Sequence, residues 1–433
     1  MTSLVHRPRQ SQWPAISMDE AYQILLKSAE GVAVEEKKFK DLQIGDVIAE
    51  DITALWPHPR FRTSRMDGYA VKSSDSTGQF QVLGGIIAGQ SARSLKIPPK
   101  HCFRINTGGI VPDDADSVVP VEYTKLISHN ESEELTIEIS LETKPGQNIR
   151  EVGSDIKQHE VLIDKSTVLT APEIALLAAN NYSKIKIFRR PIVAVISTGD
   201  ELVDINDIAE LKEGQIIDSN RPMLIELIRS QGFDCVDGGI VRDERELLVE
   251  HIKKIAEKSD VLVFSGGVSM GDKDLLKPIL LQDLDFDIKF GRVFMKPGLP
   301  NTFASGTLHN RPKFVFGLPG NPVSAYVSSH LFLFPFLRRK SGQISAEFAP
   351  KISVFLGCDI KLDRRPEYVR AVMRVEEGEC WAEVLTTNQV SSRLLSVAKA
   401  NLLLELPAFS EQRQQFRRGE KVKALVIGPM NVH

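Results

Sequence analysis

Acids, a lysine and a glycine turn follow a short apolar run at residues 261–274. Val261 to Phe264 is unbroken apolar sequence, which is typical of a strand covered on both faces of a parallel sheet. Gly266 and Gly267 allow a tight turn with exposed backbone N–H groups. Four residues with reactive side chains come next: Ser269, Asp272, Lys273 and Asp274. The segment predicts a ligand site at the carboxyl end of a strand; a capped turn with solvated charges is the alternative.

Three other expected strand ends carry similar groups. The expected strands at 192–196, 235–241 and 314–317 end in STGDE, RD and LPGNPVS, respectively. The acids of these ends would repel one another unless a divalent cation lay among them: Glu201, Asp243, Asp272 and Asp274. The positive groups of the same loops, which are the glycine amides and three lysines, would repel one another unless an anion lay among them: Lys273, Lys277 and Lys296. A metal-bound phosphate ester satisfies both conditions.

The familiar fingerprints of other phosphate chemistry are missing from these loops. GGVSMGDKD lacks the GK[ST] ending of a P-loop, and no GxGxxG follows a strand. No Ser/His/Asp or Cys/His arrangement stands out among the nine scattered histidines, so nucleophilic hydrolysis has little support.

Alternating strands and helices must position these loops. From Pro191 onward each apolar run is followed by a helical pattern, and one helix is expected to be capped by Asp218, Ser219 and Asn220 and ended by Gly232. Strand and helix at this spacing predict a doubly wound parallel sheet.

The flanking sequence has a different character. Ser17 to Glu20 reads as a capping box that opens an amphipathic helix, and a second helix has Pro172 in its first turn. The segment between these helices is strand-rich with many turns, and the sequence after about Ala349 is β-rich and reads as a small barrel or sandwich. We therefore expect the two helical pieces to form one domain, from which a β module is inserted.

The composition is that of an ordinary soluble protein of several domains. The 433 residues are 42% hydrophobic and 26% charged, with a net charge of −3. This charge disfavours a dedicated nucleic-acid or membrane-surface binder, and no apolar run is long enough for a membrane span. The four cysteines are far apart and form no zinc motif, and no signal peptide opens the chain, so we expect a cytoplasmic protein.

Eight segments in order resemble the successive motifs of the MoeA family, and most closely the E domain of gephyrin and its eukaryotic relatives. They cover nearly the whole chain after about residue 15: SRMDGYAV, INTGGIVPDDADSVVPVE, IREVGSDI, STGDEL, IIDSNRPML, SGGVSMGDKD, FGRVFMKPGLP and LPGNPVSA. The resemblance implies an α/β multidomain chain with four parts. These are a helical linker domain (15–50 and 157–188), an inserted β-rich module (51–156), a MogA-like parallel-sheet domain (189–342) and a C-terminal small β-barrel domain (343–433).

The resemblance also implies the activity of a molybdopterin molybdotransferase. Adenylylated molybdopterin and molybdate would react with the help of Mg²⁺ to give the molybdenum cofactor and AMP, in the last step of cofactor synthesis. Carried over by motif, the catalytic residues would be Asp67, Thr107, Asp155, Glu201, Asp243 and Asp274. Glu201, Asp243 and Asp274 would also hold the metal. For Asp67 and Gly68 a plain hairpin corner is the alternative.

The same resemblance gives a set of residues for binding substrate and cofactor: Gly266, Gly267, Ser269, Lys273, Lys296, Pro319, Pro322, Ser324, Arg370 and Ser391. Pro319 and Pro322 would shape a loop lining the pterin pocket, and a rigid turn is an equally good reason for them. Arg365, Ser392 and Arg393 resemble further contact residues of plant relatives. For the arginines, solvated surface is the alternative.

The family resemblance implies partners as well. The inserted module of one subunit would face the sheet domain of the other, which makes a homodimer necessary for activity. The chain shows no fused adenylyltransferase domain, so we expect a separate molybdopterin adenylyltransferase to supply the substrate. Two positions depart from the family pattern: Leu299 stands where plant and bacterial relatives often have lysine, and Arg65 replaces a small or lysine residue.

A scaffold with little or no catalysis is the alternative function. The gephyrin E domain binds receptor loops through an acid and an aromatic residue near its first helix, and Asp19 and Tyr22 occupy that segment here. A half-buried tyrosine at a helix surface explains Tyr22 equally well. The retained acids Asp67, Asp243 and Asp274 favour the enzyme, because a scaffold has no physical need for them.

Overall fold

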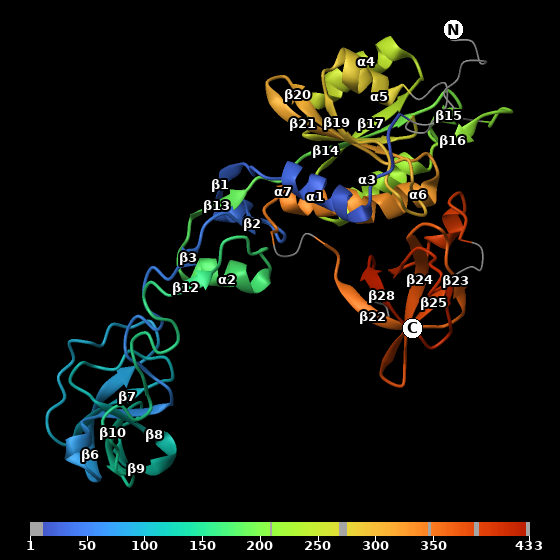
Figure 1. The fold of residues 1–433 in the computed structure, drawn as a ribbon. Coiled ribbons are helices and arrows are strands. Elements are labelled where there is room, and N and C mark those ends of the chain that lie inside the picture. Colours follow the sequence, from blue (N-terminus) through green and yellow to red (C-terminus); the bar gives the residue numbers. More distant parts are fainter. Residues whose placement is uncertain (1–11, 208–209, 268–274, 345–347, 385–388, 430–433) are drawn as a thin grey trace, which may run out of the picture. The chain divides into compact units, whose positions relative to one another are not determined.

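The structure is a computed structural model that describes residues 12–207, 210–267, 275–344, 348–384 and 389–429. The chain divides into two compact units, coloured along the sequence in Figure 1. The larger unit comprises residues 1–49, 166–169 and 185–433, and the smaller unit comprises residues 50–165 and 170–184. The smaller unit is thus inserted into the sequence of the larger one.

Two helices near the boundary begin as the sequence predicts. In α1 (Met18–Ser28) the Ser17 hydroxyl accepts a hydrogen bond from the Glu20 backbone at 3.2 Å, and the Glu20 carboxylate accepts from the Ser17 backbone at 2.9 Å, so the capping box is confirmed. α2 (Ala171–Ala179) has a proline in its first turn, also as predicted. α1 lies in the larger unit and α2 in the smaller one. The single helical domain expected from both pieces therefore stays a prediction.

The smaller unit is built on a six-stranded sheet of order β8-β5-β7-β6-β10-β9. Its strands are β5 (Gly68–Val71), β6 (Gly78–Ile86), β7 (His101–Ile105), β8 (Ser117–Pro120), β9 (Thr124–His129) and β10 (Glu134–Ile139). Short ladders join β4 (Thr63–Ser64) to β11 (Ile149–Arg150) and β3 (Ile52–Thr53) to β12 (Val161–Ile163). Residues on the two faces of this sheet are buried in separate apolar clusters.

A second six-stranded sheet organises the larger unit, in the order β17-β14-β18-β21-β20-β19. Its strands are β14 (Val193–Thr198), β17 (Cys235–Val241), β18 (Val261–Ser265), β19 (Asp287–Phe290), β20 (Thr302–Leu308) and β21 (Arg311–Leu318). β17, β14, β18 and β21 are parallel, which confirms the predicted strands. β20 and β19 extend the sheet antiparallel, so the sheet is mixed. These two strands were not predicted from the sequence, since their small and charged residues interrupt the apolar pattern.

Helices cover both faces of this sheet (Figure 1), as a doubly wound fold requires. One face packs against α1, α3 (Asn220–Ser230), α6 (Pro322–Ser328) and α7 (Phe334–Lys340). The other face packs against α4 (Arg245–Ala256) and α5 (Leu276–Pro278). The expected long apolar helix after Ser324 is α6, a five-residue π-helical turn (Ser329–Leu333) and α7.

The C-terminal part of the larger unit is a closed barrel of order β22-β25-β24-β26-β28, which confirms the predicted barrel. Its strands are β22 (Lys351–Leu356), β24 (Glu367–Glu376), β25 (Glu379–Val384), β26 (Leu402–Leu406) and β28 (Lys421–Val426). Small ladders complete the unit: β1 (Val34–Lys38), β13 (Lys184–Phe188) and β2 (Val47–Ile48); β15 (Leu202–Val203) and β16 (Ile216–Ile217); β23 (Ile360–Lys361) and β27 (Gln415–Phe416). In the described ranges, no helix combines the length and apolar character needed to span a membrane.

Candidate functional site

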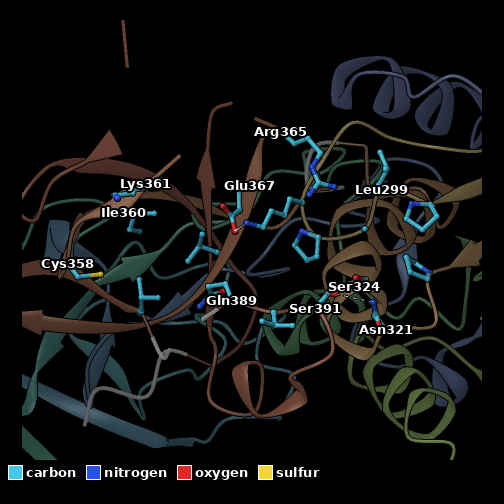
Figure 2. A pocket seen from close by; sticks show the side chains of 18 of the residues that line it. Leu299, Asn321, Ser324, Cys358, Ile360, Lys361, Arg365, Glu367, Gln389 and Ser391 are labelled. Carbon is cyan, nitrogen blue, oxygen red and sulfur yellow. Dashed lines mark hydrogen bonds and ion pairs between the residues drawn. The ribbon is translucent and has the colours of Figure 1, made fainter. Parts of the chain in front are cut away.

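A cavity of about 810 Å³ lies in the larger unit, where the loop after β21 and the segment 296–300 approach the barrel. Figure 2 shows its lining side chains converging from both sides. Four predicted binding residues contribute to the lining: Lys296, Pro319, Ser324 and Ser391. These residues are up to 95 positions apart in sequence (391 − 296), so the fold brings together positions that only their motifs had linked.

Lys296 is held between two acids of the barrel. Its ammonium lies 3.1 Å from a carboxylate oxygen of Asp363 and 3.1 Å from one of Glu367, whose side chain is only 6% exposed. Partial burial acts to lower the pKa of Lys296, but the ion pairs with the two acids outweigh it and raise the pKa above its ordinary value. The lysine is a cation whose charge is already shared, so an incoming anion must compete with these carboxylates.

Arg365 adds a second cation at this wall. Its guanidinium contacts the Asp363 carboxylate at 3.5 Å and donates to the Met295 carbonyl at 3.4 Å. The side chain is half-buried and lines the cavity, as Figure 2 shows. Part of the side chain stays accessible to solvent, so a substrate contact of this arginine stays a prediction.

Hydroxyl and amide groups line the opposite wall, at the start of α6. The Asn321 amide donates to the Ser391 hydroxyl at 3.0 Å, and the backbone N–H of Val323 donates to the Ser391 carbonyl at 3.1 Å. Ser324 is buried in the first turn of α6, and Pro322 opens that helix beside the lining residues. The LPGNPVS segment thus joins the sheet to the barrel loop, as well as forming the rigid turn expected of its prolines.

Arg370 is completely buried and does not line the cavity. Its guanidinium donates to the Tyr368 carbonyl and the Ser396 hydroxyl, both at 3.4 Å, while its Nε has no partner among the described residues. Burial lowers its pKa to about 10. The solvated alternative is wrong for Arg370, which instead lies within the barrel wall one residue from the lining residue Val369. Ser392 and Arg393 are exposed beside Ser391.

Glu201 and Asp243 lie on neighbouring loops at the carboxyl edge of the sheet. The Gly199 backbone donates to the Val241 carbonyl at 3.3 Å, and the Asp243 backbone donates to the Asp200 carboxylate at 3.2 Å. A side chain at Gly199 would meet the Glu201 carboxylate at 2.7 Å, so Glu201 folds back over that glycine. Carboxylate oxygens are the donors that Mg²⁺ prefers, and the chemistry of the two acids fits this ion.

The proposed metal set cannot be completed from the described residues, because Asp274 lies outside them, together with Ser269 and Lys273. Within residues 12–207, 210–267, 275–344, 348–384 and 389–429, no three histidine, cysteine or acidic side chains form a metal-holding group. Lys277, the other lysine of this region, is buried in α5 rather than exposed.

The glycine turn after β18 has the conformation that its sequence predicts. Gly266 and Gly267 have φ of +93° and +67°, which side chains rarely adopt. A side chain at Gly266 would also lie 2.8 Å from the Thr198 carbonyl. The Gly266 backbone donates to the Leu318 carbonyl at 3.1 Å, so this turn and the LPGNPVS loop are directly joined.

The sequence predicted Asn220 only as part of a helix cap, but the structure gives its side chain further contacts. It is the first residue of α3, and its side-chain amide donates to the Ser265 hydroxyl and the Gly320 carbonyl, both at 2.7 Å. Asp218 is the residue that caps, because its carboxylate accepts from the Arg221 backbone at 3.1 Å. The only signal in the sequence was a polar DSNR run before a buried helix.

In the smaller unit, Asp67 and Thr107 are in direct contact. One Asp67 carboxylate oxygen accepts from the Thr107 backbone at 2.6 Å and from its hydroxyl at 3.0 Å. These bonds, the backbone one first, lower the pKa of the exposed Asp67 below its ordinary value. β5, which follows Asp67, pairs with β7 and β8 and not with β4, so the hairpin-corner alternative is wrong.

Asp155 lies in a bend that follows β11, the strand that pairs with β4. It forms an ion pair with Arg150 and accepts from the Ser154 hydroxyl at 3.1 Å. Arg150 ends β11, whose partner β4 ends three residues before Asp67. The three predicted residues of the smaller unit therefore belong to connected segments.

Tyr22, considered for a receptor contact, is half-buried on α1. Its ring lies 5.1 Å from that of Phe348 and 5.9 Å from that of Phe332, measured between centroids. Burial raises its pKa well above the ordinary value. Ring packing and a side-chain hydrogen bond with Tyr368 account for its burial, and the receptor contact stays a prediction.

Comparisons with known proteins agree along the whole chain. Three family models match: the MoeA N-terminal region (domains I and II) at residues 16–180, a probable molybdopterin binding domain at 194–339 and the MoeA C-terminal region (domain IV) at 353–427. The solved molybdopterin biosynthesis MoeA protein from Pyrococcus horikoshii superposes with a TM-score of 0.80 at 27% identity, covering 96% of this chain and all of that one.

Curated relatives come from eukaryotes and bacteria. Gephyrin of Dictyostelium discoideum is 36% identical over 98% of this chain, and the molybdenum cofactor synthesis protein cinnamon of Drosophila melanogaster is 38% identical over 97%. This chain spans 64% and 67% of the length of those two proteins. Molybdopterin molybdenumtransferase of Bacillus subtilis is 32% identical, with 89% of this chain and 88% of that one covered.

Proposed function

Since the chain belongs to the MoeA family, we propose that it is a molybdopterin molybdotransferase, which inserts molybdate into adenylylated molybdopterin and releases AMP. One observation carries the proposal. Lys296, Pro319 and Ser324, which two separate motifs supply, line a single cavity with Ser391 of the C-terminal part, and the cavity is large enough for such a ligand. Bacterial relatives that match most of this chain are named for the same reaction.

The residues of the cavity suit an anionic substrate. Ser324, Ser391 and the Asn321 amide offer hydrogen-bond donors at one wall, and Lys296 and Arg365 offer cations at the other. Cleavage of a pyrophosphate bond needs charge neutralisation and positioning more than a covalent nucleophile. We assign substrate binding to these residues and to Gly266, Gly267, Ser269, Lys273 and Pro322, with Arg370 supporting the barrel wall.

Glu201, Asp243 and Asp274 would hold Mg²⁺, which when bound neutralises charge that develops on the phosphate oxygens. Gly199 and Asp200 fix the backbone of the first two acids, because Gly199 bonds the strand that leads to Asp243 and the Asp200 carboxylate accepts from the Asp243 backbone. Holding these carboxylates in place before the ion binds reduces the cost of assembling the site.

We assign further catalytic roles to Asp67, Thr107 and Asp155. The bonds from Thr107 lower the pKa of Asp67 and orient its carboxylate, which can hold or orient a cationic or protonated group of the substrate. We also propose that the chain acts as a homodimer in which the smaller unit serves the site of the other subunit, as the family pattern implies. Sedimentation of a monomer under assay conditions would contradict this.

Three further predictions belong to the same proposal. The chain divides into four parts, at residues 15–50 with 157–188, 51–156, 189–342 and 343–433. A separate molybdopterin adenylyltransferase supplies its substrate, and the protein is cytoplasmic. Limited proteolysis tests the division, because cleavage should concentrate between these parts.

The decisive experiment is AMP release from adenylylated molybdopterin by the purified chain under anaerobic conditions. We expect release only when both Mg²⁺ and molybdate are present, and the product should restore activity to a cofactor-free molybdenum enzyme. A Ser391→Ala variant should weaken substrate binding about tenfold, since a lost hydrogen bond to a charged ligand is worth roughly 1.5 kcal/mol or more. Tight binding without AMP release from the wild type would favour the scaffold alternative.

A further inference from the structure

Two adjacent residues at the start of α3 tie together the loops at the carboxyl edge of the sheet. Asn220 contacts the end of β18 and the loop after β21, through Ser265 and Gly320. Arg221 contacts the loop after β15 and the strand β17, through Asp204 and Asp237. One helical turn thus contacts the end of β18, the loops after β21 and β15, and the third residue of β17.

Arg221 is the centre of a nearly buried charge cluster. Its side chain is 9% exposed and forms ion pairs with Asp204, Asp218 and Asp237, of which the Asp218 contact is 3.1 Å. Burial acts to lower the pKa of Arg221, yet its bonds to Asp237 and Asp218 raise it. Three carboxylates around one cation repel one another, so their approach depends on this arginine.

The cluster is connected to Glu201 through a short backbone path. The Glu201 carbonyl accepts from the Ile216 backbone at 2.8 Å, and Leu202 and Val203 pair with the strand β16. The next residue is Asp204, which Arg221 holds. Moving Asp204 away from Arg221 would therefore move the segment that carries Glu201.

Asn220 joins the two loops that are expected to bind the phosphate groups. It is 8% exposed, and its two donated bonds fix the distance between the glycine turn and the LPGNPVS loop. Its Oδ1 is buried and has no hydrogen-bond partner among the described residues, so the donating side of the amide makes the contacts that join the two loops.

We propose that Asn220 and Arg221 are positioning residues with separate tasks: Arg221 positions the segment that carries Glu201 for the metal, and Asn220 positions the glycine turn and the LPGNPVS loop for the phosphate groups. This inference rests on the proposed function for its ligands. It assigns both residues to loop geometry rather than to substrate contact.

Arg221→Gln and Asn220→Ala test the two tasks by direct binding to the full chain. Mn²⁺ serves as the metal probe, measured by electron paramagnetic resonance, and pyrophosphate serves as the anion probe, measured by calorimetry. We expect Arg221→Gln to raise the Kd for Mn²⁺ about tenfold, the order found when supporting contacts of a metal site are lost, with the pyrophosphate Kd within about twofold. Asn220→Ala should give the opposite pattern.

Arg229→Gln is the matched control, because Arg229 lies on the same helix in an exposed ion pair with Glu226. It should change neither affinity. Arg221→Lys keeps the charge but not the forked geometry, and should recover part of the Mn²⁺ affinity. Arg221→Lys also replaces Arg221→Gln as the test variant if circular dichroism shows that Arg221→Gln does not fold.

The proposal is overturned when the variants lower only the melting temperature and leave both affinities unchanged, or when the wild type binds no Mn²⁺. Neither probe requires turnover. Failure of the proposed function would appear as absent AMP release from the wild type, and failure of this inference as unchanged affinities, so the two are distinguishable.

Discussion

The turn at Asp67 and the cavity at Lys296 hold their charges in opposite ways. In the smaller unit, neutral donors of Thr107 stabilise an exposed carboxylate and lower its pKa. In the larger unit, two carboxylates neutralise a partly buried lysine. Asp67 is therefore presented as a net negative charge, whereas Lys296 belongs to a group that is already balanced.

This difference indicates what each region can contribute to catalysis. A carboxylate stabilised by neutral hydrogen bonds keeps its full charge for a ligand or metal complex. A lysine between two acids can attract an anion only by sharing with them, so its effect depends on barrel residues that no single motif contains. The comparison predicts that loss of the Asp67 charge has little effect on stability, whereas loss of the Lys296 charge lowers it.

The largest effect should come from closing the space behind the Asp67 turn. In Gly68→Ala the new methyl group would lie 2.0 Å from the Val119 carbonyl oxygen, a backbone atom of the neighbouring strand. We expect a loss of about 3 kcal/mol in unfolding free energy, because β5 must shift against β8. Urea unfolding measures the loss, and hydrogen exchange should locate it in β5, β7 and β8.

Gly85→Ala is the control in the same unit. A methyl group there meets only the Arg104 guanidinium, at 3.3 Å, which can move aside. Its effect should stay within about 0.5 kcal/mol. Equal losses for the two variants would mean that backbone overlap is not what makes Gly68 necessary.

A smaller effect should follow when Lys296 loses its charge. Lys296→Met leaves Glu367, 6% exposed, without that cation, and we expect a loss of about 2 kcal/mol in unfolding free energy. Replacing Glu367 by methionine as well should recover about half of that loss, since the unpaired acid is then removed. Chemical unfolding of the two single variants and the double variant measures the coupling.

Lys351→Met gives the matched comparison within the barrel. Its ion pair with Glu405 is more exposed, with 47% and 21% of the side chains accessible, and should contribute at most about 0.5 kcal/mol. If Lys296→Met and Lys351→Met cost the same unfolding free energy, burial of Glu367 would not make Lys296 important for stability.

The fold was predictable where local signals were strong. The parallel strands β14, β18 and β21 contain short unbroken apolar runs, and the capping box at Ser17 is a local pattern of side chains. β20 was not predicted because its sequence, TFASGTL, contains small and polar residues. It is a strand because β21 pairs along its full length, which is a contact that the local sequence does not express.

The candidate site was predictable in its residue types but not in its pairings. The motifs supplied Lys296, Asp67 and Thr107, yet Asp363 and Glu367, which neutralise Lys296, come from barrel sequence with no recognised motif. Arg221 looked like an ordinary helix residue, since its three acidic partners are separated by strands and loops. Charge clusters of this kind depend on tertiary approach, and spacing in the sequence does not reveal them.

The smallest effect concerns the hydroxyl of Thr107. Thr107→Val removes one of the two bonds to Asp67 but keeps the backbone bond, which is the larger cause of the lowered pKa. The pKa of Asp67 should therefore rise partway toward its ordinary value of about 4. Carbon-detected NMR titration of the carboxylate in the wild type and the variant measures this shift.

The sign of the accompanying stability change follows from linkage. Because folding lowers the pKa of Asp67, the stabilisation is complete above the unfolded value of about 4 and is lost as the pH falls through the folded value. The difference in stability between wild type and Thr107→Val should thus be constant near neutral pH and shrink in acid. A difference that grew toward low pH would show that Thr107 acts through packing, and would remove the basis for treating Asp67 as a carboxylate held by hydrogen bonds.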